Sequence, residues 1–173
     1  MTDQIIQGEF TSTRPVTPAD LDLLTAWFSD PEVYRWWDGS PKPREEVADK
    51  YLGRRPPPPV VQSFIIETGA EPIGYIHHWE ADANSGGIDM FLIPSRRERG
   101  LGPDAARAMV RYLLQERKWR RVTVDPYTDN PRAIHAWGKV GFRVECEVAD
   151  HPGGPALLMV IEADSYADNQ QSS

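Results

Sequence analysis

The chain has 173 residues, which suits one domain with a proper hydrophobic core. Its 19 Lys plus Arg and 26 Asp plus Glu give a formal charge of −7, which argues against nucleic acid or an anionic membrane as partner and suits a cationic small molecule. The single cysteine, Cys146, excludes an internal disulfide, and no apolar run reaches the roughly 18–20 residues of a membrane span, so we expect a cytoplasmic protein with Cys146 as a buried apolar filler.

The first half of the chain predicts a strand, two helices and two further strands. Residues 1–7 are expected to be disordered, and a strand follows over 9–16. Thr17 is a good helix N-cap, because Pro18 suits the first helical position and Asp20 the third. The apolar spacing and turn residues then predict helices over 17–30 and 43–53 and strands over 60–67 and 72–80.

The second half alternates strands and helices. A short apolar strand at residues 88–93 is followed by a helix that opens at Pro103 and runs to about Lys118. A strand over 121–124, a helix over 132–140 that Gly141 ends, and strands over 142–148 and 156–161 complete the order. We predict a mixed α/β fold with a central mixed sheet of about seven strands flanked by about four helices, as a single domain over 8–165 with a polar tail over 166–173.

A glycine-rich turn lies between the strand at 88–93 and the helix that follows it. Gly100 and Gly102 are two residues apart, so consecutive backbone N–H groups can turn inward and form an anion-sized concavity at a helix N-terminus. Arg97 and Arg99 add forked donors that suit phosphate oxygens. The nucleotide-hydrolysing and dinucleotide-binding glycine patterns are both absent from the sequence. These residues predict a diphosphate cradle.

The turn Arg97-Glu98-Arg99-Gly100-Leu101-Gly102 resembles the R/Q-x-x-G-x-G/A motif of the GNAT acyltransferase superfamily, whose members bind coenzyme A there. Asn130-Pro131-Arg132-Ala133, then Trp137, then Gly141-Phe142, resembles the second signature of that family. The resemblance implies a GNAT-like fold and acetyl-CoA as cofactor. It implies that the cofactor contacts Met90, Phe91, Leu92, Ile93, Arg97, Glu98, Arg99, Gly100, Leu101, Gly102, Asn130, Arg132, Ala133 and Trp137.

Within the superfamily, the sequence is most similar to aminoglycoside 6′-N-acetyltransferases. The matching pieces span roughly residues 10 to 162 and are Trp36-Trp37-Asp38-Gly39, Glu71-Pro72-Ile73-Gly74-Tyr75, Gly87-Ile88-Asp89 and Asp125-Pro126. This similarity implies acetyl transfer from acetyl-CoA to a primary amine of an aminoglycoside. The four histidines and one cysteine show no metal-ligand spacing, so we expect no metal.

Acidic residues near the predicted cradle suit an amine acceptor. An amine in water is mostly protonated, so the site must remove a proton before the nitrogen can attack. We expect Asp89 to be the base or to position a water, and Asp125 to anchor an ammonium group. His77 and His78 alternate on a strand, so one of them faces the acceptor or both are ordinary histidines. The predicted acceptor contacts are Trp36, Trp37, Asp38, His78, Asp89 and Asp125.

Two departures from the family pattern affect the expected chemistry. Trp137 stands where the family has a tyrosine that hydrogen-bonds or protonates the departing thiolate, and an indole N–H donates a hydrogen bond without serving as an acid. Tyr127 is a candidate substitute. Pro103 removes one N–H from the cradle, and Asp104 brings a negative charge near the diphosphate unless its side chain turns away.

Two other functions remain open from the sequence. One is a siderophore-pathway acyltransferase that acts on a lysine-type or hydroxylamine group with a longer acyl chain. The other is a non-catalytic GNAT domain that binds coenzyme A or an aminoglycoside, which Trp137 suggests. A monomer and a homodimer are both compatible with the sequence.

Overall fold

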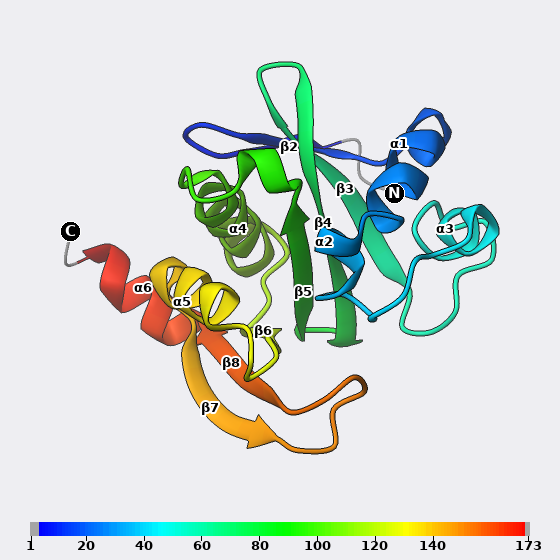
Figure 1. Cartoon of the computed structure of the whole chain (residues 1–173). Helices are drawn as coiled ribbons and strands as arrows, with labels where there is room; N and C mark the ends of the chain where they lie inside the picture. The colour runs from blue at the N-terminus through cyan, green and yellow to red at the C-terminus, as the bar shows by residue number, and fades with distance from the viewer. Residues whose placement is uncertain (1–3, 172–173) are drawn as a thin grey trace.

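The computed structural model describes residues 4–171 and has an eight-stranded mixed sheet with the strand order β1-β2-β3-β4-β5-β6-β8-β7 (Figure 1). Neighbouring strands are antiparallel except β5 and β6, which are parallel. The predicted mixed α/β fold is therefore confirmed, with one more strand than expected. The strands are β1 (Ile6–Gln7), β2 (Ser12–Pro15), β3 (Val61–Thr68), β4 (Glu71–Asp82), β5 (Ser85–Leu92), β6 (Arg121–Val124), β7 (Arg143–Val148) and β8 (Ala156–Glu162).

Helices cover both faces of the sheet (Figure 1). One face packs against α4, its continuation and α5 around a core that contains Met109, Leu113 and Trp119, and the other packs against α1, α2 and α3 around Phe28 and Tyr75. The capping of the first helical turn is as predicted, since the Asp20 carboxylate accepts hydrogen bonds from the Thr17 N–H and hydroxyl. The helices are α1 (Leu21–Phe28), α2 (Pro31–Tyr34), α3 (Arg44–Lys50), α4 (Leu101–Arg111) with a wider turn over Tyr112–Glu116, α5 (Pro131–Val140) and α6 (Ala163–Gln171), with short 3₁₀ turns at Pro18–Asp20 and Pro94–Arg96.

Several local features differ from the sequence-based expectation. Strand β1 begins at Ile6, inside the segment predicted to be disordered, and α6 covers most of the predicted polar tail; residues 1–3 and 172–173 lie outside the described part. The segment between the strands predicted at 72–80 and 88–93 is mostly strand with a tight turn, because β4 extends to Asp82, β5 begins at Ser85, and the Asp82 carboxylate accepts hydrogen bonds from the Asn84 N–H and the Ser85 hydroxyl. The prediction that Cys146 is buried was wrong: it is exposed on β7, the edge strand.

Strands β5 and β6 separate after a short paired region. Their pairing covers three residue pairs, from Ser85 with Arg121 to Gly87 with Thr123, although β5 continues to Leu92. Gly87 is required at this point because a Cβ atom there would lie 2.5 Å from the Trp79 indole. The separation leaves space between two neighbouring strands in the middle of the sheet, and the cavities described next lie around it.

Candidate active site

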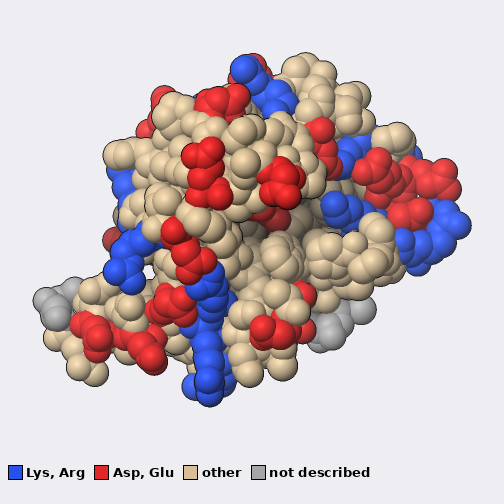
Figure 2. Space-filling model, turned by 90° about the horizontal axis from the view of Figure 1, so that it is seen from below, with Lys and Arg blue, Asp and Glu red and all other residues tan. Residues whose placement is uncertain are grey.

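Two cavities meet where β5 and β6 separate. The acidic cavity has a volume of about 450 Å³ and is lined by Asp38, Asp89 and Asp125, and the basic cavity has a volume of about 650 Å³ and is lined by Arg97, Arg107, Arg132 and Lys139. Figure 2 views the molecule from below and shows a hollow near the centre of this surface, with acidic and basic side chains on its rim. The residues shared by the two cavities are Trp36, Trp37, Met90, Asn130, Ala133 and Trp137.

The basic cavity is built around the N-terminus of α4. Gly100 precedes the helix with φ 77°, a left-handed conformation that glycine adopts without strain, and a Cβ atom on Gly100 would have no neighbour within 4 Å. Arg97 is held in place because its Nε donates to the Leu92 carbonyl at 3.0 Å and its guanidinium donates to the Glu32 carbonyl at 2.8 Å. Free helix N–H groups and cationic side chains in one cavity suit a phosphate-bearing ligand.

Asp104 in the first turn of α4 turns away from this cavity. Its carboxylate accepts hydrogen bonds from the N–H groups of Glu9, Phe10 and Thr11 at 2.9, 3.0 and 2.9 Å, and from the Thr11 hydroxyl at 2.7 Å. Burial acts to raise the pKa of Asp104, but these four hydrogen bonds outweigh it and lower that pKa. The Asp104 carboxylate therefore stabilises the turn between β1 and β2, and its negative charge does not repel an anion in the cradle.

Most of the predicted cofactor contacts line the basic cavity. They are Met90, Phe91, Leu92, Arg97, Glu98, Gly100, Gly102, Asn130, Arg132, Ala133 and Trp137. Ile93, Arg99 and Leu101 are not part of that lining: Ile93 donates its N–H to Ile73, Leu101 packs against the main core, and Arg99 is exposed at the surface. Asn130 also caps α5, because its side chain accepts a hydrogen bond from the Ala133 N–H at 3.2 Å.

In the acidic cavity, Asp89 ends a chain of hydrogen bonds that crosses three strands. The His77 Nε2 lies 2.9 Å from Asp89, the His77 Nδ1 lies 3.0 Å from the Tyr75 hydroxyl, and that hydroxyl lies 2.8 Å from the Ser63 hydroxyl. Burial acts to raise the pKa of Asp89. The hydrogen bonds from His77 and Trp79 and the positive charge of Lys50 outweigh it, so the pKa is lowered and the carboxylate stays ionised.

Asp125 occupies the matching position on the other side of the gap. It lies two residues after Thr123, as Asp89 lies two residues after Gly87, and Thr123 pairs with Gly87. The His151 Nε2 lies 2.9 Å from the Asp125 carboxylate. Burial and the negative charge of Asp89 raise the pKa of Asp125, and His151 offsets only part of that effect. The two carboxylates of one cavity therefore have pKa values displaced in opposite directions.

The structure contradicts the prediction that His78 contacts the acceptor. It is buried on the opposite face of β4, where its ring lies 5.8 Å from Phe64 and 5.5 Å from Trp119, and burial lowers its pKa to about 3. It is therefore a neutral core residue and has no route to the acceptor. His77, the other member of the alternating pair, lines the acidic cavity.

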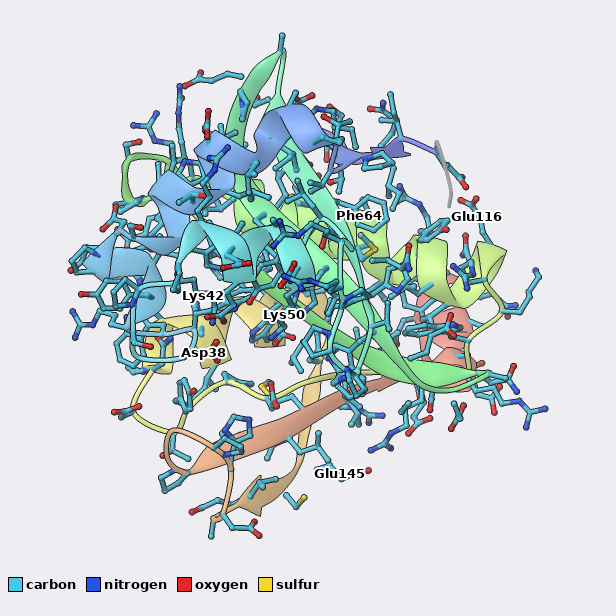
Figure 3. The ribbon with its side chains drawn as sticks, turned by 90° about the vertical axis from the view of Figure 1, so that its right-hand side faces the viewer. Asp38, Lys42, Lys50, Phe64, Glu116 and Glu145 are labelled. Carbon is cyan, nitrogen blue, oxygen red and sulfur yellow. The ribbon has the colours of Figure 1, made fainter. Side chains whose placement is uncertain are left out.

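The aromatic segment before α3 forms one wall of the acidic cavity. The Trp37 Nε1 donates to the Tyr51 hydroxyl at 3.0 Å, and the Arg35 guanidinium lies 4.9 Å from the Trp36 ring. Asp38 forms an ion pair with Lys42, and Figure 3 shows both side chains on the same side of the molecule as Lys50. Trp36, Trp37 and Asp38 therefore line the acidic cavity, and their contact with an acceptor stays a prediction.

Trp137 lies where the two cavities meet, and Tyr127 lines the acidic cavity alone. Trp137 is buried and its ring packs against Phe142 at 5.4 Å. The Tyr127 hydroxyl donates to the Pro152 carbonyl at 3.3 Å, and burial together with Asp38 raises its pKa. Both residues line the cavity, but Tyr127 is already engaged with the loop between β7 and β8.

Sequence reasoning missed His77, His151 and Lys50 as cavity residues. His77 had a signal, since one of two alternating histidines had to face the acceptor side. No sequence signal pointed to His151, because it lies in a predicted turn that is far from Asp125 along the chain. Among residues 4–171, no group of three or more His, Cys, Asp or Glu side chains is arranged to hold a metal ion, and no helix there has the length and apolar character to cross a membrane.

Parallel strands that separate beside a glycine-rich helix N-terminus form an α/β site with a basic cavity on one side, suited to an anionic ligand, and an acidic cavity on the other, suited to a cationic one. The model for the Acetyltransferase (GNAT) domain matches residues 13–143. The chain belongs to the GNAT acetyltransferase family, which confirms the predicted resemblance and the enzyme class, an acetyl-CoA-dependent N-acetyltransferase.

Individual relatives show which members of this family the chain is similar to. The aminoglycoside N(6′)-acetyltransferase type 1 of Klebsiella pneumoniae is 32% identical over 175 residues, which cover 92% of this chain and 86% of that protein. The structure of AAC(6′)-Ib with coenzyme A and kanamycin is 27% identical and superposes with a TM-score of 0.80 over 92% of this chain and 99% of that one. The structure of AAC(6′)-Ib with ribostamycin and coenzyme A is 28% identical, with a TM-score of 0.81 and coverage of 92% and 97%.

Proposed function

We propose that this protein transfers the acetyl group of acetyl-CoA to a primary amine of an aminoglycoside-like polycation. The observation that carries the proposal is the pair of opposed carboxylates, Asp89 and Asp125, in a cavity that is continuous with the glycine-lined basic cavity. The similarity to aminoglycoside N(6′)-acetyltransferases supports the same acceptor class. We also propose a cytoplasmic location, and a monomer or homodimer as the working form.

The basic cavity fits the diphosphate end of coenzyme A. Gly100 and Gly102 carry no Cβ, so the backbone N–H groups at the start of α4 are accessible to phosphate oxygens. Arg97 and Arg132 supply positive charge, and Asn130 lies where the pantetheine arm would pass toward Trp137. When bound, acetyl-CoA supplies an activated acetyl thioester. Main-chain N–H groups near Met90 and Phe91 would polarise its carbonyl.

The acidic cavity binds and activates the acceptor. Asp89 and Asp125 attract ammonium groups, and one of them accepts the proton that the amine must lose before it attacks the acetyl carbon. Trp36 and Trp37 provide flat apolar surface next to these charges, which suits a sugar ring that carries ammonium groups. Because the attraction is electrostatic, we expect acceptor binding to weaken as salt is added.

The test is thiol release from acetyl-CoA in the presence of kanamycin or tobramycin. We expect the wild type to release thiol and to be stabilised against heating by coenzyme A. Asp125→Asn should lose most of the turnover but keep the stabilisation by coenzyme A, because Asp125 does not line the basic cavity. Absence of turnover with every aminoglycoside tested, despite stabilisation by coenzyme A, would remove the proposed acceptor.

The sequence left a non-catalytic binding domain open, because Trp137 is an indole and cannot protonate a departing thiolate. Membership of the acetyltransferase family supports the enzyme instead, and a non-catalytic domain would bind coenzyme A and aminoglycoside without releasing thiol. The acyl donor distinguishes the siderophore-pathway alternative from the proposed reaction, since the siderophore reaction would favour long-chain acyl-CoA over acetyl-CoA.

A further inference from the structure

Lys50, the last residue of α3, is the only Lys or Arg among the described residues that line the acidic cavity. Its side chain is partly buried, and Figure 3 shows it on the same side of the molecule as Asp38 and Lys42. The carboxylate Asp125 comes from a different part of the fold, directly after β6. A cation in a cavity whose carboxylates attract ammonium groups opposes that attraction locally, so its place in the cavity bears on which acceptor fits.

The acidic side chains beside Lys50 on α3 are engaged with other cations. Glu46 precedes Lys50 by one helical turn, but its carboxylate lies 3.0 Å from the Nζ atom of Lys42. Asp49, the neighbour of Lys50 in the sequence, pairs with the Arg54 guanidinium at 2.6 Å. Neither carboxylate therefore neutralises Lys50.

The Lys50 ammonium has no ion-pair or hydrogen-bond partner in the part of the chain that the structure describes. Its Nζ atom lies 5.3 Å from the centre of the Tyr51 ring, a contact that leaves its N–H donors open to a ligand. Its positive charge acts on Asp89, but the close partner of that carboxylate is His77 at 2.9 Å. An unpaired ammonium in a cavity favours a ligand group that accepts hydrogen bonds and repels a second cation.

The charge that the cavity offers an acceptor is smaller than its three carboxylates suggest. Asp38 forms an ion pair with Lys42, whose side chain is buried. Within residues 4–171, Asp89 and Asp125 have no Lys or Arg partner, and Lys50 offsets part of their combined charge. The cavity therefore suits a cation whose ammonium groups lie toward the two carboxylates and whose surface toward Lys50 is uncharged.

We propose that Lys50 is a specificity residue that selects acceptors with a hydroxyl group facing it and discriminates against acceptors with an ammonium group there. This role rests on the proposed function and specifies the acceptor as a hydroxyl-bearing amino sugar. The amine that receives the acetyl group must reach the place where the two cavities meet, so the sugar ring that carries this amine lies in the acidic cavity. A sugar hydroxyl accepts a hydrogen bond from Lys50 without adding positive charge.

Kanamycin A and kanamycin B test this role, because they differ only at C2′ of the ring that carries the 6′-amine, with a hydroxyl in one and an amino group in the other. Dissociation constants of both are measured by calorimetry on the complex with coenzyme A, and kcat/KM by thiol release. In Lys50→Gln, the preference for kanamycin B over kanamycin A should rise about fivefold or more in both measurements, and less at high salt.

Two matched variants accompany Lys50→Gln. Lys50→Arg keeps the positive charge, so its preference should stay within about twofold of the wild type. Lys118→Asn removes a lysine at an exposed position outside both cavities and should leave the preference unchanged.

Equal tightening of both kanamycins in Lys50→Gln would overturn this role, because Lys50 would then act only through its effect on Asp89. A preference in Lys50→Arg that matches Lys50→Gln would overturn it as well. L-Lysine is a further acceptor to compare: acetylation by the wild type that Lys50→Gln loses would make a carboxylate, not a hydroxyl, the partner of Lys50. A wild type that releases no thiol with any aminoglycoside removes the proposed function itself, and that outcome is distinct from an active wild type whose preference Lys50→Gln does not change.

Discussion

Asp104→Asn tests whether this acid stabilises the fold or weakens cofactor binding. One Asp104 oxygen accepts three hydrogen bonds and the other accepts one, from the Glu9 N–H. An asparagine with its carbonyl at the three-bond position points an amide NH₂ at the part-buried Glu9 N–H, and leaving that donor unpaired costs about 1 kcal/mol, the low end of the range for buried donors. The three remaining bonds also lose the assistance of a charged acceptor, so we expect a total loss of about 2–4 kcal/mol.

This loss is large against the roughly 5–15 kcal/mol that stabilises a typical domain, and it corresponds to about 4–16 °C in melting temperature for a chain of this length. The pKa of Asp104 is lowered in the folded state, so its contribution is complete above the unfolded pKa of about 3.9 and is lost as the pH falls through the folded pKa. The difference between wild type and Asp104→Asn should therefore narrow below about pH 4.

Urea unfolding followed by tryptophan fluorescence at pH 7 and pH 3 measures both effects, with Asp150→Asn as a control for removal of an exposed carboxylate. Binding of coenzyme A should be unchanged in Asp104→Asn below its melting temperature, because the carboxylate points away from the cradle. A variant within about 0.5 kcal/mol of wild type at pH 7, or one that binds coenzyme A much more tightly, would refute this reasoning.

Three further changes test the cavities. Lys50→Gln should lower acceptor KM severalfold for multiply charged amines, because it removes the positive charge that acts on Asp89, and the effect should be smaller at high salt. The control is Lys118→Asn at an exposed position, and an unchanged KM in Lys50→Gln contradicts the prediction. Gly100→Ala should cost about 1 kcal/mol of stability, because its φ is 77°, and should raise the dissociation constant for coenzyme A measured by calorimetry; unchanged binding would place the phosphates elsewhere. Trp137→Tyr should raise kcat for thiol release if an acid is lacking, and an unchanged kcat would mean that thiolate departure does not limit turnover.

The local features of the site were predictable from the sequence, and the pairing of distant segments was not. The cradle follows from Gly100 and Gly102 after an apolar strand, because glycine spacing and helix entry are local properties. The choice between His77 and His78 depends on which face of β4 is turned to the gap, and that is set by pairing with β3 and β5. Cys146 was assigned to the core because nothing local marks β7 as the edge strand.

The role of the loop between β7 and β8 could not be predicted either, because it also depends on the pairing of segments that are distant in the sequence. Its residues read as an ordinary turn, yet the fold brings His151 to 2.9 Å from Asp125 and the Pro152 carbonyl to the Tyr127 hydroxyl. Both contacts join β8 and its loop to the end of β6, two strands that pair although 31 residues of other structure separate their ends. A carboxylate at a strand end is visible in a sequence, but its hydrogen-bond partner is not.

The two cavities separate charge, and this separation affects how the two ligands bind together. The basic cavity attracts a polyanion through Arg97, Arg107 and Arg132, while Asp89 and Asp125 attract a polycation on the other side of Trp137. A polyanion in the first cavity adds negative potential next to the second, so it should strengthen binding of a polycation there, and the coupling must be equal in the reverse direction. Because the cavities meet at the gap between β5 and β6, this mutual attraction brings the thioester and the amine to the same place in the sheet.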